Sequence, residues 1–241
     1  MENLTDKTIL ITGAAYRLGK VMALAAARQG ANVIIHHGHS AAEAEATASE
    51  IRALGRSAWV LQADLNLTDD TQQLVLKANA LSPLYALVNS ASVFTPGGFL
   101  ETSLVTWQEN ININLTAPFI LSQEFIKAHI KDQPGRIINL LDWRALRPGR
   151  DHFAYTIAKA GLAAMTKSVA LAAAPSITVN AIALGAILPP SDGNNENILQ
   201  PVPAKRWANL SELEETVLFL LSGPAYITGE IIHLDGGRHL V

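Results

Sequence analysis

The chain has 241 residues, of which 49% are hydrophobic and 16% are charged, and its formal net charge is −3. There is no basic stripe, which argues against a nucleic-acid partner, and no apolar run reaches the roughly 18 residues that a membrane span needs. The absence of cysteine excludes disulfides and thiolate chemistry, and the polar start predicts no signal peptide, so we expect a cytoplasmic protein.

Short β-branched or apolar runs alternate with longer amphipathic runs along most of the chain. The short runs predict strands at 8–12, 32–36, 58–62, 86–89, 136–140, 178–182 and 231–234. The longer runs predict helices near 18–29, 41–54, 69–81, 101–132, 152–174 and 211–222. This alternation predicts an α/β protein with a Rossmann-type, doubly wound, seven-stranded parallel sheet. No linker divides residues 1–241, so we expect a single domain.

Two segments do not fit a simple periodic pattern. Residues 108–115 alternate with period two, as a strand would, but their helical flanks favour a helix. Residues 187–206 contain four prolines and a polar, glycine-containing run. A loop of that length inside a compact domain is typical of an active-site lid, so we expect a substrate lid there.

A glycine-flanked turn follows the first predicted strand. Gly13 permits a tight turn, and Gly19 lets the next helix approach the sheet. The backbone N–H groups between them can face a pyrophosphate at the positive end of the helix. The alternative is that a strand-to-helix turn with two glycines needs no ligand.

The end of the second strand bears on the choice between NADH and NADPH. An NAD site usually offers an acidic residue there, whereas this chain has His36, His39 and Ser40, and Glu43 is the first acid. Arg17 in the glycine turn adds a cation that can pair with a 2′-phosphate. We therefore expect NADPH and no metal. For Ser40 a structural alternative stands beside this one, since Ser40 and Glu43 have the spacing of a helix capping box.

Asp142, Tyr155 and Lys159 are the candidate catalytic residues. Tyr155 and Lys159 are four residues apart in a predicted helix, so they share one face, and a lysine ammonium favours the phenolate of a neighbouring tyrosine. Asp142 lies thirteen residues before Tyr155, at the carboxyl end of a predicted strand, where open α/β sheets bind their ligands. The alternative for Asp142 is a turn or cap residue.

These residues resemble, in order and over nearly the whole chain, the motifs of the short-chain dehydrogenase/reductase family. The matching residues are Thr12-Gly13, Gly19, Asp64-Leu65, Asn89 to Ala91, Asn114, Asp142, Tyr155, Lys159 and Asp235 to Gly237. The resemblance implies a Rossmann subunit, usually a homotetramer, in which Asn114, Tyr155 and Lys159 relay protons. It implies cofactor contacts from Gly13, Arg17, Leu18, Gly19, His36, His39, Ser40, Asp64, Leu65, Asn89, Ala91, Ser92, Tyr155, Lys159 and Gly185.

The departures from the usual family pattern look like the pteridine reductase branch, which includes dihydromonapterin reductase-like proteins. Arg17 replaces a glycine, Ser92 replaces another glycine, and Asp142 replaces the usual catalytic serine. In that branch the residue matching Phe94 stacks on the pterin ring; without the resemblance, Phe94 would be read as packing a loop. The resemblance implies substrate contacts from Arg17, Ser92, Phe94, Asp142 and Tyr155.

The chemistry of Asp142 independently favours this branch. A ketone reductase needs a hydroxyl that donates to the developing oxyanion, and an ionised carboxylate would repel it. Reduction of a ring C=N instead places the developing charge on a nitrogen that takes a proton from Tyr155, and Asp142 can assist that transfer. We expect NADPH-dependent reduction of a dihydropterin or dihydrofolate to the tetrahydro form.

Other interpretations stay open. The alternatives are a 3-oxoacyl-type carbonyl reductase and a non-catalytic NADPH sensor. The physiological pterin or folate is not identified by the sequence. Trp143 can line the substrate pocket or cover the core. The arginines at 144, 147 and 150 predict a solvated loop, with the subsidiary hypothesis that they contact an anionic substrate tail.

Overall fold

A parallel sheet of seven strands, in the order β3-β2-β1-β4-β5-β6-β7, forms the centre of the computed structural model. The structure describes residues 3–130, 133–189 and 197–241. The strands are β1 (Thr8–Ile11), β2 (Asn32–His37), β3 (Ala58–Gln62), β4 (Leu84–Asn89), β5 (Gly135–Asp142), β6 (Ile177–Leu184) and β7 (Ile231–Leu234). This confirms the predicted fold class.

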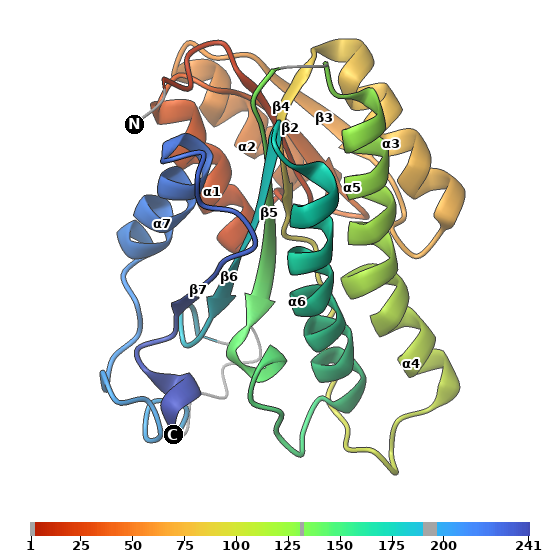
Figure 1. Cartoon of the computed structure of the whole chain (residues 1–241), viewed down its shortest axis with the longest axis vertical. Coiled ribbons are helices and arrows are strands. Elements are labelled where there is room, and N and C mark those ends of the chain that lie inside the picture. Colours follow the sequence, from red (N-terminus) through yellow and green to blue (C-terminus); the bar gives the residue numbers. More distant parts are fainter. Residues whose placement is uncertain (1–2, 131–132, 190–196) are drawn as a thin grey trace.

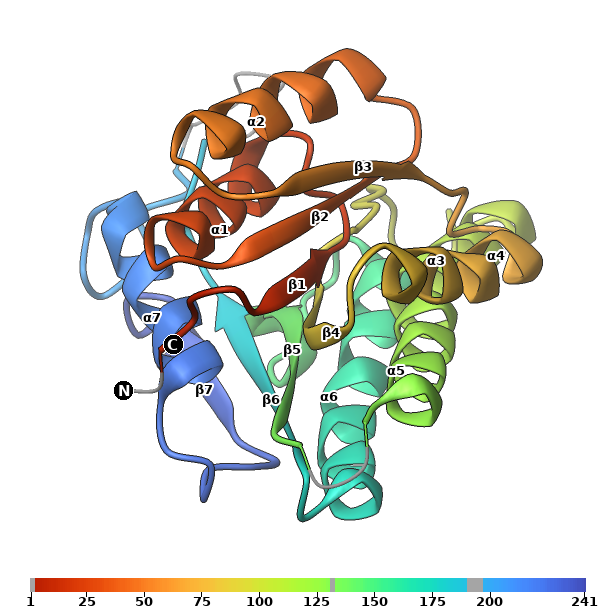
Figure 2. The same cartoon turned by 90° about the horizontal axis from the view of Figure 1, so that it is seen from above.

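Helices cover both faces of the sheet (Figures 1 and 2). One face carries α1 (Arg17–Arg28), α2 (Ala41–Ala53) and α7 (Leu210–Ser222), and the other carries α3 (Thr68–Leu81), α4 (Leu104–Ile111), α5 (Ala117–Ala128) and α6 (Phe153–Ala173). Because the central strands are buried on both faces, their sequences are nearly continuous apolar runs. Within the described ranges, no helix is both long and apolar enough to cross a membrane.

The strand order reverses between β1 and β4. The chain builds outward from β1 through β2 to β3, then returns and places β4 on the other side of β1. The loops leaving the carboxyl ends of β1 and β4 therefore diverge, and ligands of doubly wound sheets bind in the crevice between such loops.

The long helix predicted for 101–132 is divided. Between α4 and α5 the backbone forms one π-helical turn, η1 (Asn112–Thr116), and residues 131–132 lie outside the described ranges. The helical interpretation of 108–115 is correct. The alternation arises because asparagines, instead of apolar residues, face inward: Asn110 and Asn114 are fully buried, and their side-chain amides find hydrogen-bond partners.

The predicted lid at 187–206 is described only in part, since 190–196 lie outside the described residues. Its second half is attached to the body of the protein. Val202 is buried, and the N–H of Ala204 donates a hydrogen bond of 3.0 Å to the carbonyl of Gly236. The lid stays a prediction.

Candidate active site

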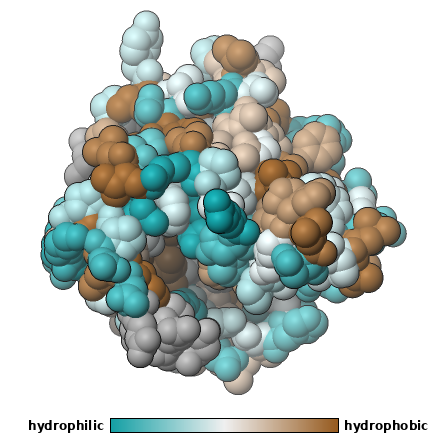
Figure 3. Space-filling model, turned by 90° about the horizontal axis from the view of Figure 1, so that it is seen from below, coloured by the Kyte–Doolittle hydropathy of each residue, from teal (hydrophilic) through white to brown (hydrophobic). Residues whose placement is uncertain are grey.

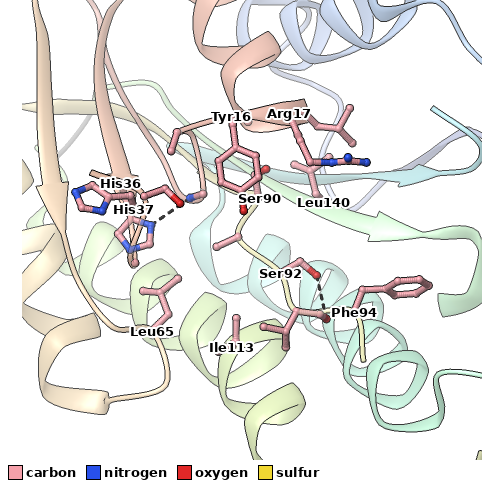
Figure 4. Close-up of a pocket in the computed structure, with 18 of the residues that line it drawn as sticks. Tyr16, Arg17, His36, His37, Leu65, Ser90, Ser92, Phe94, Ile113 and Leu140 are labelled. Carbon is pink, nitrogen blue, oxygen red and sulfur yellow. Dashed lines mark hydrogen bonds between the residues drawn. The ribbon is translucent and has the colours of Figure 1, made fainter. Parts of the chain in front are cut away.

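A cavity of about 760 Å³ opens at the carboxyl ends of the strands. Figure 4 shows His36 and His37 at one end of it and Phe94 at the other. Of the predicted site residues, those lining the cavity are Gly13, Arg17, Leu18, Gly19, His36, His39, Ser40, Asp64, Leu65, Ala91, Ser92, Phe94, Asp142, Tyr155, Lys159 and Gly185. Asn89 and Asn114 do not line it. Tyr16, His37, Glu109 and Ile113 line it but were not predicted from the sequence.

Gly13 and Gly19 frame the turn after β1, and neighbouring backbone atoms lie too close to either residue to leave room for a side chain. Gly13 has φ +64°, and a Cβ there would lie 2.9 Å from Cα of Ala91. A Cβ on Gly19 would lie 2.1 Å from the carbonyl oxygen of Gly13. A side chain at either position would therefore fill or distort the turn, which leaves a backbone-lined cradle at the start of α1, as a pyrophosphate needs.

His36 supports this cradle from beneath. Its Nδ1 accepts a hydrogen bond of 3.2 Å from the N–H of Gly13, and its Nε2 donates to the carbonyl of Ala63 at 3.1 Å. Burial lowers the pKa of His36 to about 4, so the ring is neutral near pH 7. The Gly13 N–H and both ring nitrogens of His36 are thus engaged within the protein, and the contact of His36 with a cofactor stays a prediction.

His37 is the polar residue of this region that sequence reasoning missed. It is 5% exposed and lines the cavity, and within the described part of the chain its Nδ1 has no hydrogen-bond partner. Ser40 is the residue before α2, but its side chain makes no capping hydrogen bond, so the capping-box alternative is wrong. The reason is its backbone, at φ −97° and ψ 60°, which differs from the extended conformation that caps adopt. Ser40 lines the cavity, and its contact with a cofactor stays a prediction.

Arg17 lines the cavity and contacts the segment that follows β6. It has the left-handed φ of +51°, at the position where the family resemblance expects glycine, and its Nη2 donates a 3.0 Å hydrogen bond to the carbonyl of Pro189. The side chain therefore reaches from the glycine turn to the first part of the predicted lid segment. Its contact with a phosphate or substrate stays a prediction.

The side chain of Asn89 lies outside the cavity lining, and its predicted cofactor contact stays a prediction. The side chain is buried behind the cavity, where its Nδ2 donates to Oδ1 of Asn139 at 2.8 Å. These two residues are paired across β4 and β5, so the amide joins the two strands beneath the site. Asp64 and Leu65, by contrast, line the cavity as predicted.

The catalytic candidates come together at the ends of β5 and α6. Asp142 is the last residue of β5, and its Oδ1 accepts a 2.8 Å hydrogen bond from the N–H of Arg144. The phenol of Tyr155 lines the same cavity as Asp142 and Ser92, and both side chains influence its pKa. The amine of Lys159 lies 5.7 Å from the Tyr155 ring centroid and donates to the carbonyl of Leu140 at 2.8 Å.

Burial dominates the ionisation of this group. Burial, followed by the charge of Asp142, raises the pKa of Tyr155 well above its ordinary value and outweighs any lowering by the Lys159 cation. Burial lowers the pKa of Lys159 to about 8. Burial also raises the pKa of Asp142, an effect opposed by its hydrogen bonds and ion pair with Arg144. Tyr155 is accordingly a protonated acid near neutral pH.

Asn114 contacts the loop after β4 instead of the lysine. Ser92 Oγ donates to Asn114 Oδ1 at 2.6 Å, and Asn114 Nδ2 donates to the carbonyl of Val93 at 3.0 Å. Among the described residues no direct hydrogen bond joins Asn114 to Lys159. The side chain therefore positions the loop that carries Phe94.

Phe94 is paired with a residue that sequence reasoning missed. Its ring stacks on His152 at 3.7 Å between centroids, with 9° between the planes, and meets the Tyr155 ring edge-on at 4.7 Å. His152 contacts Asp151 at 3.0 Å, and Asp151 pairs with Arg144 at 2.9 Å. Arg144, predicted to lie in a solvated loop, is thus partly buried beside Asp142. The left-handed φ of His152, +51°, brings its ring back toward Phe94, and sequence periodicity carries no signal for this.

The parallel sheet, the glycine cradle at its switch point and the buried tyrosine–lysine pair define a Rossmann-fold oxidoreductase with a nicotinamide dinucleotide site. More narrowly, the chain belongs to the short-chain dehydrogenase family, whose model matches residues 7–198.

Relatives of this chain carry two different activities in their names. It is 35% identical to a 3-oxoacyl-[acyl-carrier-protein] reductase of Synechocystis sp., over 98% of both chains. A solved structure of FolM alternative dihydrofolate reductase 1 from Brucella canis, complexed with NADP, is 36% identical with a TM-score of 0.92 and covers 100% of this chain and 97% of its own. The Brucella suis protein, also with NADP, is 36% identical with a TM-score of 0.91, over 98% and 96% of the two chains.

Proposed function

We propose that this protein catalyses the NADPH-dependent reduction of a pteridine, taking a dihydropterin or dihydrofolate to its tetrahydro form. The observation that carries the proposal is that Asp142 and Tyr155 line the same cavity, where burial and the Asp142 carboxylate raise the pKa of the phenol. A carbonyl reductase needs a hydroxyl donor at this point, because negative charge develops on the substrate oxygen. A carboxylate is better suited to a substrate that presents ring N–H and amino donors.

The residues of the chain have separate roles in this reaction. A bound NADPH, held by the cavity residues around Gly13 and Lys159, would supply a hydride for a ring carbon. Tyr155 donates a proton to the adjacent ring nitrogen, and its raised pKa keeps the phenol protonated until the transfer. Asp142 orients the phenol and accepts hydrogen bonds from the substrate. Lys159, fixed to Leu140, places a cation behind the phenol that stabilises the phenolate left after transfer.

The end of β2 supports NADPH over NADH. The cavity there is lined by His37, His39 and Ser40, and Arg17 lies across from them in the glycine turn. None of these side chains would repel a 2′-phosphate, whereas the carboxylate typical of NAD sites is absent from this strand end. The two Brucella relatives contain NADP.

A second candidate function is reduction of a 3-oxoacyl thioester. The relatives from Synechocystis and from Staphylococcus aureus, which is 32% identical over 97% of this chain and 98% of its own, favour it by name. In that case Asp142 would replace a serine without changing the reaction. The NADPH cavity and the Tyr155–Lys159 pair would serve both reactions.

Oxidation of NADPH, followed with dihydrobiopterin, dihydromonapterin, dihydrofolate and an acetoacetyl thioester as alternative substrates, separates the two functions. We expect the highest kcat/KM with one of the three pteridines. A wild-type enzyme that turns over the thioester most efficiently would assign the protein to the carbonyl reductases.

For the assembly, we propose a homotetramer in the cytoplasm, as the family resemblance implies. Leu100, Leu104 and Val105 near the start of α4 are 88%, 69% and 74% exposed, and Leu171 on α6 is 84% exposed. The space-filling view shows apolar side chains gathered on the side where α4 begins (Figure 3). Exposed apolar groups of this kind favour association. Light scattering after gel filtration would give the subunit number.

A further inference from the structure

The ring of Phe94 is supported on one side and left open on the other. The His152 imidazole stacks on it with 3.7 Å between the centroids and 9° between the planes, and the Tyr155 ring meets it edge-on at 4.7 Å. Phe94 lines the cavity and is 51% exposed, whereas His152 lies outside the cavity lining and its side chain is only 18% exposed. His152 therefore backs the Phe94 ring, and the uncovered part of that ring is turned to the cavity.

A carboxylate fixes His152 in turn. Oδ2 of Asp151 accepts a hydrogen bond of 3.0 Å from Nδ1 of His152 and another of 2.9 Å from Nη2 of Arg144. Burial raises the pKa of Asp151, but the hydrogen bonds and charge of Arg144 and the hydrogen bond of His152 lower it to about 2. Asp151 is thus ionised near neutral pH and can only accept hydrogen bonds, so Nδ1 of His152 is the donor and the imidazole is held in one orientation.

The backbone at His152 has a conformation that few side chains adopt. Its φ of +51° is left-handed, and the residue immediately precedes α6. Asparagine, aspartate and histidine are the non-glycine residues most often found there. Surrounding contacts must hold such a backbone in place, and the contacts here are those to Asp151 and to the Phe94 ring.

The loop that follows β4 is attached to the start of α6 beside this stack. The N–H of Phe153 donates a 2.9 Å hydrogen bond to the carbonyl of Gly97, and the Phe153 ring meets Phe99 edge-on at 5.1 Å. Asn114 holds the other end of the loop at Ser92. The stack is therefore built on a loop that is fixed at both ends.

The same contacts connect the Phe94 ring to the carboxyl group of Asp142. Oδ1 of Asp142 accepts the N–H of Arg144 at 2.8 Å and lies 3.6 Å from Nη1 of that residue. The Arg144 guanidinium then pairs with Asp151, and Asp151 holds His152. One continuous series of contacts thus sets the orientation of both the aromatic ring and the carboxyl group.

We propose that His152 is a positioning residue for the substrate: by stacking behind Phe94, it holds that ring in the plane on which a flat heteroaromatic substrate lies. Stacked aromatic rings attract each other, and a ring already fixed in its bound orientation loses no further freedom when a substrate binds. This inference rests on the proposed function and adds what selects its substrate class. An acyclic 3-oxoacyl chain has no ring plane to align, so His152 gives it no advantage.

Two substitutions separate the ring of His152 from its hydrogen bond. His152→Asn removes the ring, keeps an N–H donor for Asp151 and suits the left-handed backbone. His152→Phe keeps an aromatic ring and removes the donor. His129→Asn is the matched control, because His129 also contacts a phenylalanine, Phe125, at 5.4 Å between centroids, but it follows α5 and lies outside the cavity lining.

KM and kcat are measured with NADPH and either a dihydropterin or an acetoacetyl thioester. We expect His152→Asn to raise KM for the dihydropterin by roughly three- to tenfold, the loss of one stacking contact, and to change kcat little. His152→Phe should return this KM to near the wild-type value. Neither substitution should change KM for the thioester, and His129→Asn should change KM for neither substrate.

Three results would overturn the proposal. They are an unchanged KM for the dihydropterin in His152→Asn, an equal rise in KM for both substrates, and a His152→Phe variant as impaired as His152→Asn. The last result would show that the hydrogen bond to Asp151, and not the ring, is what matters.

The wild-type protein gives a readout that does not depend on the folding of a variant. Nuclear Overhauser effects between the ring protons of His152 and Phe94 should be present in the free protein and persist when NADP⁺ and a pterin are added. Their loss on addition of the pterin would overturn the proposal, because His152 would then leave its place behind Phe94.

The proposed function can fail separately from this role of His152. If the wild-type enzyme reduces no pteridine, equilibrium binding of a pterin to the protein loaded with NADP⁺ tests the role. Binding that is weakened in His152→Asn and kept in His152→Phe would support it without the reaction. A wild-type protein that binds no pterin would overturn both proposals, and normal dihydropterin reduction by His152→Asn would overturn this one alone.

Discussion

Asp142 and Tyr155 line the same cavity, and burial together with the Asp142 carboxylate raises the pKa of the phenol, while the Lys159 amine donates to the Leu140 carbonyl. The proton on Tyr155 is thereby held in the free enzyme. It becomes transferable when a substrate nitrogen that is gaining negative charge is placed beside it.

Replacement of Asp142 by serine tests this relationship. We expect Asp142→Ser to lower kcat for the preferred dihydropterin by about 10²–10⁴-fold, the usual cost of losing a positioned proton-transfer group. NADPH affinity should change little. Tyr155→Phe should cost at least as much, because it removes the donor itself.

Asp142→Ser should also reduce a thioester faster than the wild-type enzyme does. Serine restores a hydroxyl donor for an oxyanion, so reduction of an acetoacetyl thioester should rise relative to wild type. The reading of Asp142 is falsified if Asp142→Ser reduces dihydropterins at the wild-type rate.

Cofactor binding should favour NADPH. We expect NADPH to bind at least about tenfold more tightly than NADH, a difference of about 1.4 kcal/mol, because Arg17 lines the cavity and no carboxylate ends β2. Fluorescence titration of both cofactors measures the preference, and equal affinities would contradict the NADPH assignment.

His36 should make the fold sensitive to acid. The folded-state pKa is about 4 and the ordinary value is 6.5, so between these pH values the unfolded chain binds the extra proton. Its contribution to stability is therefore complete above pH 6.5 and is lost as pH falls toward 4. The gap corresponds to at most about 3 kcal/mol of unfolding free energy.

Urea unfolding of wild type and His36→Asn from pH 7 to pH 4 tests the assignment. The difference in unfolding free energy between the two proteins should shrink as the pH falls. His39→Asn is the control, since His39 is exposed at the same strand end. A wild-type-to-His36→Asn difference that stays constant over this range would show that the buried ring is not the acid-sensitive group.

Asn114 should affect substrate binding through the loop it holds. Asn114→Ala removes the hydrogen bonds to Ser92 and to the Val93 carbonyl, so Phe94 loses part of its support. We expect KM for the pteridine to rise several-fold and the unfolding free energy to fall by about 1–3 kcal/mol, the cost of leaving buried partners unpaired. A fall in kcat alone, with KM and stability unchanged, would instead assign Asn114 to proton relay.

The sequence alone was enough to predict the fold and the proximity of Asp142 to Tyr155. Strand ends and helical spacing are local properties, and the carboxyl end of β5 must lie beside the start of α6 once the sheet forms. The predicted β5 and β6 were shorter than the observed strands. These strands are buried on both faces and continue to Asp142 and Leu184.

Other parts of the site depend on tertiary contacts that no local pattern encodes. The Phe94–His152 stack needs the left-handed backbone at His152. Asn89 has the spacing of a cofactor ligand but pairs with Asn139 across two strands. The direction of the Lys159 amine follows from which carbonyl lies nearest in the folded protein.

The π-helical turn at Asn112–Thr116 imposes a strict length on this part of the chain. A π turn takes five residues where an α turn takes four, so it absorbs one extra residue while the flanking helices stay aligned. Deleting residue 112 or 113 would restore an ordinary α-helix and leave Asn110 and Asn114 three residues apart, about 60° from each other around the axis. The shortened helix would be more regular and its residues no poorer helix formers. Asn110 and Asn114 could no longer both face the loop after β4, so the deletion should abolish the alignment of the site. Spectroscopy that measures helix content would not detect this change.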